Sequence, residues 1–282
     1  MASEPEQLRA EQLERWQRAA AGWGRRADRM RETTTALSQW MLDQLALKPG
    51  QRVLELAAGP GDTGFLAAAR IAPGTLISSD ASEAMIELAR TRAGALGVEN
   101  VEFRRLQLEW IDLPAASVDA VLCRLGLMLC VDPAAAAGEI RRVLRPGGRA
   151  ALAVWDVPER NPWATIPGRV LVELGHMPPP DPSLPGMFAL APQEKLSGLL
   201  EDAGFLDILV TGIDVDRTYE DADDFLAETL DFARPIAEVW ERLTDPERTE
   251  VRDRIAALSE PYRSSAGTIG LPGRSLAAAA SA

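Results

Sequence analysis

The sequence has few of the residues that form disulfides or hold metals. Its 282 residues include only two cysteines and one histidine. Cys123 and Cys130 are too few for a disulfide framework, and no histidine or second cysteine pair near them suggests a zinc site. We therefore expect two reduced thiols and no metal, in a chain long enough to bury a sizeable core without cross-links.

Long apolar runs and excess basic charge are also absent. The N-terminal segment is charged throughout and contains nothing like a signal peptide, and no later run is long enough to span a bilayer. This predicts a cytoplasmic protein without stable membrane insertion. The formal net charge is −12 at pH 7. Because nucleic-acid backbones are bound mainly by clustered Lys and Arg, we do not expect DNA or RNA as partners.

Short apolar runs alternate with amphipathic segments beyond residue 50, which is typical of βαβ units around a parallel sheet. The chain is expected to be a single domain, residues 1–282, with a Rossmann-like, doubly wound α/β fold. Its sheet should be mostly parallel with an antiparallel C-terminal strand, and residues 49–157 should form its core. The predicted strands are residues 52–57, 75–79, 101–106, 118–123, 149–155, 205–215 and a closing strand within 267–280.

Three segments are expected to cover this core. Apolar and aromatic residues recur at helical spacing in residues 4–46, which predicts two helices separated at Gly22-Trp23-Gly24 and an N-terminal cap over residues 1–48. Residues 158–191 are rich in proline and predict no strand, while residues 219–262 are mostly helical in pattern. Both are predicted lid or insert segments.

The most informative segment is a strand that runs into glycines and then into a helix, residues 53–64. Gly59, Gly61 and Gly64 satisfy the GxGxxG pattern of dinucleotide-binding loops. Asp80 follows Gly59 by roughly 20 positions, where an acid that binds ribose belongs. An NAD(P)-dependent oxidoreductase is therefore one interpretation.

Charge around the loop favours another ligand. Glu55 near the strand end and Asp62 at the helix start place carboxylates where a pyrophosphate needs free backbone N–H groups. S-adenosylmethionine has no phosphate, and its sulfonium and ammonium groups suit an acidic surrounding. Asp80 can serve its ribose equally well, although this residue could also be a simple helix cap before Ser82.

Four motifs occur in order along the chain: ELAAGPG at residues 55–61, SDAS at 79–82 with Met85, EWIDLP at 109–114 leading into SVDAV, and LRPGG at 144–148. Through them the sequence resembles the class I S-adenosylmethionine-dependent methyltransferases, in the branch of the ubiquinone and menaquinone biosynthesis methyltransferases (methyltransferase type 11). The resemblance covers residues 50–157 well and the rest in outline. It implies methyl transfer from S-adenosylmethionine.

The resemblance also implies a cofactor site. It places the methionine portion beside the loop that holds Glu55, Ala57, Gly59 and Gly61, and the methionine amine at the backbone around Arg124. It places the ribose at Asp80. The adenine would lie between Ala81 and Met85 on one edge and Gln107 and Leu108 on the other.

Two positions depart from the family pattern, and one has an equal alternative. Ala57 stands where the first loop glycine is usual, which is tolerable if its φ is negative. Gln107 replaces a frequent aspartate, so an amide oxygen would have to bind the adenine amino group. Met85 fits plain helix core as well as a ligand contact.

The methyl acceptor is expected to be a small molecule. Methyl transfer needs mainly the positioning of the acceptor, although a phenol or quinol carbon can also require a base. His176, the only histidine, is the candidate catalytic base, yet a lone loop histidine is more often simply solvated. Trp16, Trp23, Trp155 and Trp163 would suit a flat apolar acceptor or equally the core.

A non-catalytic protein that binds S-adenosylmethionine is a further alternative, because a fold does not imply an activity. The sequence gives no indication of the oligomeric state.

Overall fold

The computed structural model describes residues 4–182 and 184–282. Seven strands hydrogen-bond into one sheet with the order β3-β2-β1-β4-β5-β9-β6. These strands are β1 (Arg52–Leu56), β2 (Thr75–Asp80), β3 (Val101–Arg105), β4 (Val118–Arg124), β5 (Leu144–Trp155), β6 (Leu206–Asp214) and β9 (Arg274–Ser281).

The sheet is parallel except for the last strand of the chain. β1 is parallel to both β2 and β4, and the pairs β2–β3 and β4–β5 are also parallel. β9 is antiparallel to its neighbours β5 and β6. The predicted Rossmann-like, doubly wound sheet with an antiparallel C-terminal strand is thus confirmed. Strand order reverses at β1, so ligands are expected at the carboxyl ends of β1 and β4.

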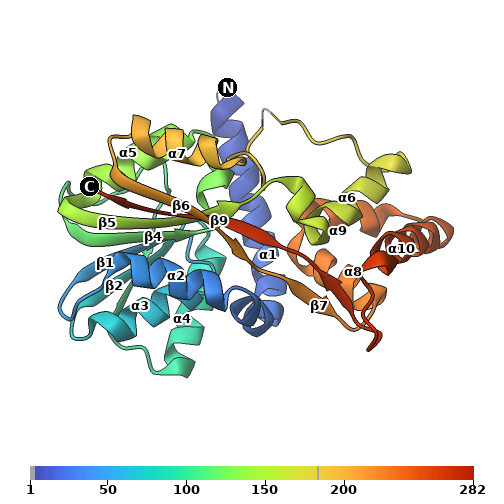
Figure 1. Cartoon of the computed structure of the whole chain (residues 1–282), viewed down its shortest axis with the longest axis horizontal. Helices are drawn as coiled ribbons and strands as arrows, with labels where there is room; N and C mark the ends of the chain where they lie inside the picture. The colour runs from blue at the N-terminus through green and yellow to red at the C-terminus, as the bar shows by residue number, and fades with distance from the viewer. Residues whose placement is uncertain (1–3, 183) are drawn as a thin grey trace.

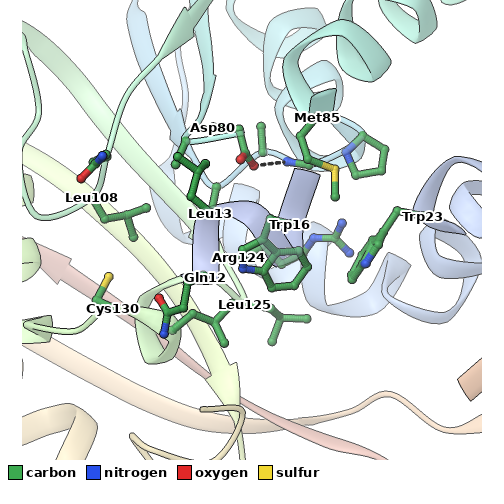
Figure 2. A pocket seen from close by; sticks show the side chains of 18 of the residues that line it. Gln12, Leu13, Trp16, Trp23, Asp80, Met85, Leu108, Arg124, Leu125 and Cys130 are labelled. Carbon is green, nitrogen blue, oxygen red and sulfur yellow. Dashed lines mark hydrogen bonds between the residues drawn. The ribbon is translucent and has the colours of Figure 1, made fainter. Parts of the chain in front are cut away.

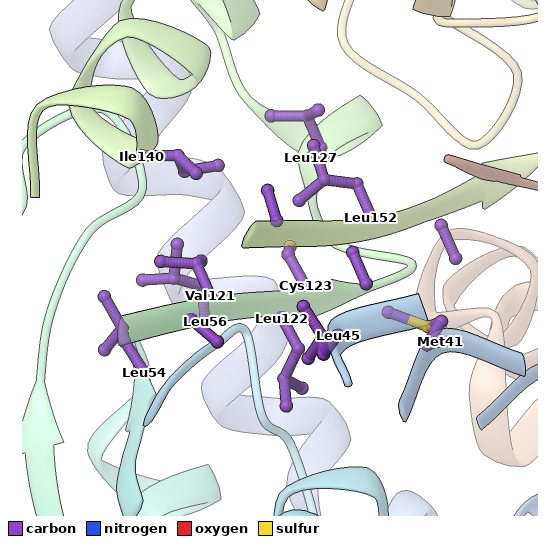
Figure 3. Close-up of a cluster of buried hydrophobic side chains, with 14 of the residues drawn as sticks. Met41, Leu45, Leu54, Leu56, Val121, Leu122, Cys123, Leu127, Ile140 and Leu152 are labelled. Atoms are coloured by element: carbon purple, nitrogen blue, oxygen red, sulfur yellow. The ribbon is translucent and has the colours of Figure 1, made fainter. Parts of the chain in front are cut away.

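Helices cover both faces of this sheet (Figure 1). One face carries α2 (Thr35–Leu45), α3 (Asp62–Ile71) and α4 (Glu83–Leu96), and the other carries α5 (Pro133–Val143) and α7 (Gln193–Asp202). Figure 3 shows Met41 and Leu45 of α2 on one side of β4 and Ile140 of α5 on the other. Because helices cover both faces, the central strands β1 and β4 are buried along nearly their whole length, whereas the edge strand β3 stays partly exposed.

A helical lobe lies at the end of the sheet opposite the C-terminus (Figure 1). Its elements are α6 (Pro162–Glu173), α8 (Ala222–Phe232), α9 (Arg234–Arg242), α10 (Asp245–Ser259) and the two-stranded ribbon of β7 (Arg217–Tyr219) and β8 (Ile269–Leu271). Val170, Phe225 and Ile255 belong to its own buried cluster. The two segments predicted as lids therefore pack together around a second core.

Helix α6 lies in the proline-rich segment, one of the predicted helical lid segments, for which the sequence predicted no strand. Pro162 occupies its first turn, where the missing N–H has no helical partner in any case, so this proline favours a helix start. The structure also has three short 3₁₀ turns, η1 (Leu127–Leu129), η2 (Pro158–Arg160) and η3 (Glu260–Tyr262). In the described ranges, no helix has the length and apolar character needed to cross a bilayer.

The first helix, α1 (Glu4–Thr33), runs between the sheet and the helical lobe (Figure 1). It is continuous, so the predicted break at Gly22-Trp23-Gly24 is wrong. A Cβ on Gly22 would lie 2.3 Å from the carbonyl oxygen of Asp231, and one on Gly24 would lie 3.2 Å from Leu88. These glycines allow close packing against α8 and α4 and do not end the helix.

Candidate functional site

A cavity of about 170 Å³ lies at the carboxyl ends of β1, β2 and β4, under α1 (Figure 2). This is the edge where the reversed strand order predicts a ligand. The candidate residues from the sequence that line it are Ala57, Gly59, Asp80, Ala81, Met85, Gln107, Leu108 and Arg124. Glu55, Gly61 and His176 are not among the lining residues.

Glu55 lies beneath the glycine loop rather than in the cavity. Its carboxylate accepts hydrogen bonds from the Gly64 N–H at 2.7 Å and the Ser78 hydroxyl at 3.1 Å. Gly64 is in the first turn of α3, where N–H groups have no helical partner. A Cβ on Gly64 would lie 2.0 Å from a carboxylate oxygen, so only glycine fits there. Glu55 therefore fixes the glycine loop onto the start of α3.

Burial of Glu55 raises the pKa of its carboxyl from 4.5 to about 7. The folded state thus holds this proton more tightly than the unfolded state. The tighter binding of this proton stabilises the folded state fully below pH 4.5. As the pH rises to about 7 this contribution is lost, which lowers the free energy of unfolding by up to about 3 kcal/mol.

Glu55→Gln is expected to remove this loss, because the neutral amide can still accept from Gly64 and donate to Ser78. Urea unfolding at pH 5 and at pH 8 should give a smaller fall in stability for the variant than for wild type. Parallel pH profiles of the two proteins would contradict a titrating Glu55. Asp80, whose pKa burial also raises, is present in both and cancels from the comparison.

The two loop glycines have different roles. Gly59 has φ +52° and lines the cavity, and a Cβ there would meet no atom within 4 Å. Gly61 has φ +87° and precedes α3, and a Cβ there would lie 2.4 Å from the ring of Phe65. Gly61 does not line the cavity, and its approach to the methionine portion stays a prediction. Gly61 shapes the turn, because a side chain there would be strained and would collide with Phe65.

Ala57 adopts φ +49°, so the expectation of a negative φ is wrong. This left-handed conformation costs a non-glycine residue roughly 1–2 kcal/mol. Gly126, which has no side chain, lies opposite Ala57. A Cβ on Gly126 would lie only 2.4 Å from the Cβ of Ala57. The methyl group of Ala57 and the bare backbone of Gly126 therefore share one space at the floor of the cavity.

We expect Gly126→Ala to destabilise the protein by about 1–3 kcal/mol, because the two methyl groups would overlap. Ala57→Gly alone should have a small effect, since relief of strain is offset by the greater backbone freedom of glycine. The double variant should recover much of the lost stability. Denaturant unfolding of all four proteins gives the coupling energy, and simple additivity would contradict this pairing.

Asp80 ends β2 and binds the glycine loop to the start of α4. Its carboxylate accepts from the Gly59 N–H at 3.0 Å and the Ser82 N–H at 2.9 Å, and it also lines the cavity. Ser82 in turn caps α4 by accepting from the Met85 N–H at 3.3 Å. Capping and ligand contact are thus divided between two residues, which leaves the cavity side of Asp80 available.

Arg124, the last residue of β4, reaches the cavity with its side chain as well as its backbone. The guanidinium donates to the Thr34 hydroxyl and lies 3.8 Å from a carboxylate oxygen of Asp62. Asp62 makes a closer ion pair with Arg92, at 2.8 Å. The sequence suggested only the Arg124 backbone, because its neighbours Thr34 and Asp62 come from other parts of the chain.

Sequence reasoning missed much of the contribution of α1. Gln12 and Leu13 join Trp16 and Trp23 among the lining residues (Figure 2). The rings of the two tryptophans pack edge to face with centroids 6.0 Å apart. Arg9 on the same helix pairs with Glu109, next to the adenine candidates Gln107 and Leu108. The helical spacing of Leu13 and Trp16 indicated a buried face, but not what it would cover.

The remaining candidates lie in or beside the helical lobe. His176 follows α6, close to Glu247 of α10, and the structure does not bring it to the cavity. Trp155 and Trp163 pack against each other with centroids 4.9 Å apart, and the Arg217 guanidinium lies 3.7 Å from the Trp163 ring. These two tryptophans therefore join the lobe to the sheet, while Trp16 and Trp23 face the cavity.

Known proteins resemble this chain in the same region. A family model described as a methyltransferase domain matches residues 47–167. The arsenite methyltransferase of Halobacterium salinarum is 33% identical over 190 residues, which span 66% of this chain but only 46% of that protein. The UbiE C-methyltransferase of ubiquinone and menaquinone biosynthesis from Cellvibrio japonicus is 25% identical over 180 residues, 60% of this chain and 72% of that protein.

A solved structure confirms the fold over a longer stretch. Phosphoethanolamine N-methyltransferase 2 of Haemonchus contortus, in complex with S-adenosylmethionine, superposes with a TM-score of 0.54 at 16% identity, over 87% of this chain and 52% of that one. The matched residues 47–167 include β1 with its glycine loop, Asp80 and β4, the elements that build the cavity. Residues 47–167, which hold these elements, are therefore similar to the catalytic domains of class I S-adenosylmethionine-dependent methyltransferases.

Proposed function

We propose that this protein transfers the methyl group of S-adenosylmethionine to a small, flat, apolar molecule. The observation that carries the proposal is the two-sided character of the cavity. One side consists of strand ends and polar loop groups, with Asp80 and Gly59, and the other consists of Leu13, Trp16 and Leu129. The first side suits a nucleoside with an amino-acid tail, and the second suits an aromatic ring.

The loop chemistry supports S-adenosylmethionine over a dinucleotide. A pyrophosphate would need free N–H groups in the first turn of α3, but the Gly64 N–H is already bound by Glu55. Asp80 offers carboxylate oxygens for the two ribose hydroxyls, and Gly59 leaves open space above the loop. The residues present therefore fit the cofactor.

The bound cofactor would supply an activated methyl group on its sulfonium, so the protein has mainly to align the acceptor and exclude water. The carboxylates that line the cavity are already engaged, since Glu109 pairs with Arg9 and Asp80 accepts two backbone N–H groups. Burial raises the pKa of the Cys130 thiol, so this group stays protonated. The acceptor should therefore bring its own nucleophilic atom, as an electron-rich ring carbon or an ionised oxygen does.

Calorimetry with S-adenosylmethionine, S-adenosylhomocysteine and NAD tests the cofactor assignment. We expect binding of the first two and none of NAD. Tight NAD binding without S-adenosylmethionine binding would overturn the proposal in favour of an oxidoreductase. Turnover of labelled methyl groups on a panel of quinols, phenols and amines tests the acceptor class, and binding without turnover on any of them would favour a non-catalytic protein.

A further inference from the structure

We propose that the Arg124 side chain binds the carboxylate of the methionine portion of S-adenosylmethionine. This inference rests on the proposed function, and it replaces the expected role of the backbone at this position with one for the guanidinium. It is carried by a buried arginine that lines the cavity and whose donors the surrounding protein only partly uses.

The bonds of Arg124 show what remains available. An arginine has five N–H donors. One Nη group donates to the Thr34 hydroxyl, and the other lies 3.8 Å from Asp62, beyond hydrogen-bonding distance. Its side chain is 10% exposed, so bulk water does little to satisfy the rest. A ligand carboxylate in the cavity would complete this set, because the guanidinium geometry matches a carboxylate in a two-point contact.

The charges around Arg124 point to an anion. Asp62 is shared between Arg92 at 2.8 Å and Arg124 at 3.8 Å, and one of its oxygens has no hydrogen-bond partner. The other nearby carboxyl, Glu55, faces Gly64 and Ser78 instead. Arg92 also has Asp28 at 3.7 Å, whereas Asp62, at 3.8 Å, is the one carboxylate within ion-pair distance of Arg124 in the described ranges. A ligand carboxylate would give Arg124 a partner at hydrogen-bonding distance.

The order of the strands gives the direction of the ligand. Asp80 stands at the end of β2, the glycine loop follows β1, and Arg124 stands at the end of β4. These strands are neighbours in the order β2-β1-β4. A cofactor with its ribose at Asp80 and its chain over Gly59 therefore extends toward Arg124, where its amino-acid end must lie.

Binding titrations with paired ligands test the assignment. S-adenosylhomocysteine and 5′-methylthioadenosine share the nucleoside and a neutral sulfur, but only the first has the amino-acid end. Arg124→Met should weaken S-adenosylhomocysteine by at least about tenfold and leave 5′-methylthioadenosine within about twofold. Arg124→Lys should recover part of the loss. Wild type should also prefer S-adenosylmethionine to its decarboxylated form, and Arg124→Met should lose this preference.

Arg92→Met is the matched control, because it removes the other guanidinium from Asp62 without lining the cavity. It should leave the ratio of the two thioether affinities unchanged. Equal losses on both thioethers in Arg124→Met, or no preference of wild type for the carboxylated cofactor, would overturn this inference alone. If Arg124→Met fails to fold, the preference of wild type for S-adenosylmethionine over its decarboxylated form still tests the carboxylate contact. Absence of any binding of S-adenosylmethionine to wild type would instead refute the proposed function.

Discussion

Glu228→Ala is expected to lower the free energy of unfolding by about 3–5 kcal/mol, the largest effect on stability that we predict for one side chain. Glu228 is 2% exposed and accepts from Arg217 at 2.7 Å and from the Tyr219 hydroxyl at 2.9 Å. It also pairs with Arg29 of α1 at 2.8 Å. Its removal would leave the Arg217 guanidinium, itself 3% exposed, buried without a carboxylate.

Urea or guanidinium unfolding measures this loss. Asp223→Ala is a matched control on the same helix, because its pair with Arg252 is exposed to solvent and should contribute little to stability. The double variant Arg217→Met/Glu228→Leu should lose much less than Glu228→Ala, since it leaves no unpaired charge at this position. A loss for Glu228→Ala as small as that of the control would show that the buried pair is not needed.

Asp80→Ala is expected to weaken S-adenosylmethionine by at least about tenfold, because charge-assisted hydrogen bonds contribute roughly 1.5–3 kcal/mol each. The ribose is common to S-adenosylmethionine, S-adenosylhomocysteine and 5′-methylthioadenosine, so all three should weaken together. This pattern differs from that expected for Arg124→Met, which spares the last. The two variants therefore test opposite ends of one ligand.

Asp80 also holds the glycine loop through Gly59 and α4 through Ser82, so part of the loss could come from the loop. Asp80→Asn keeps one acceptor oxygen and hence one of the two loop hydrogen bonds, but its NH₂ group cannot accept the other backbone N–H, so its affinity should fall between those of wild type and Asp80→Ala. Glu83→Gln, an exposed acid in the first turn of α4, is the control and should bind normally. Unchanged affinity in a folded Asp80→Ala would refute the ribose assignment.

Local patterns in the sequence predicted the sheet and the edge of it at which the cavity lies. β1, β2 and β4 are buried along nearly their whole length, and each contains adjacent apolar residues, a local pattern that is readable without contacts. Gly59 and Asp80 were found for a related reason, since each directly follows or ends a predicted strand. Parallel strands bring such positions to one edge, so their proximity follows from topology alone.

The contacts of individual side chains could not be predicted from local patterns. The Glu55 carboxylate turns under the loop because the absent side chain of Gly64 leaves room there, and the positive φ of Ala57 is accommodated by Gly126, far along the chain. His176 lies with the helical lobe and not at the cavity. These outcomes depend on contacts between distant segments, which local spacing does not encode.

The cover of the cavity was likewise decided by packing. The two glycines in α1 predicted a break from their local helix propensity, but they are the points at which α1 contacts α8 and α4 most closely. That contact, with the ion pairs from Arg26 and Arg29 to Asp231 and Asp224, fixes α1 against α8. Trp16 lies at the cavity as a result, because helix packing and long-range charge pairs override intrinsic propensity once a tertiary partner is present.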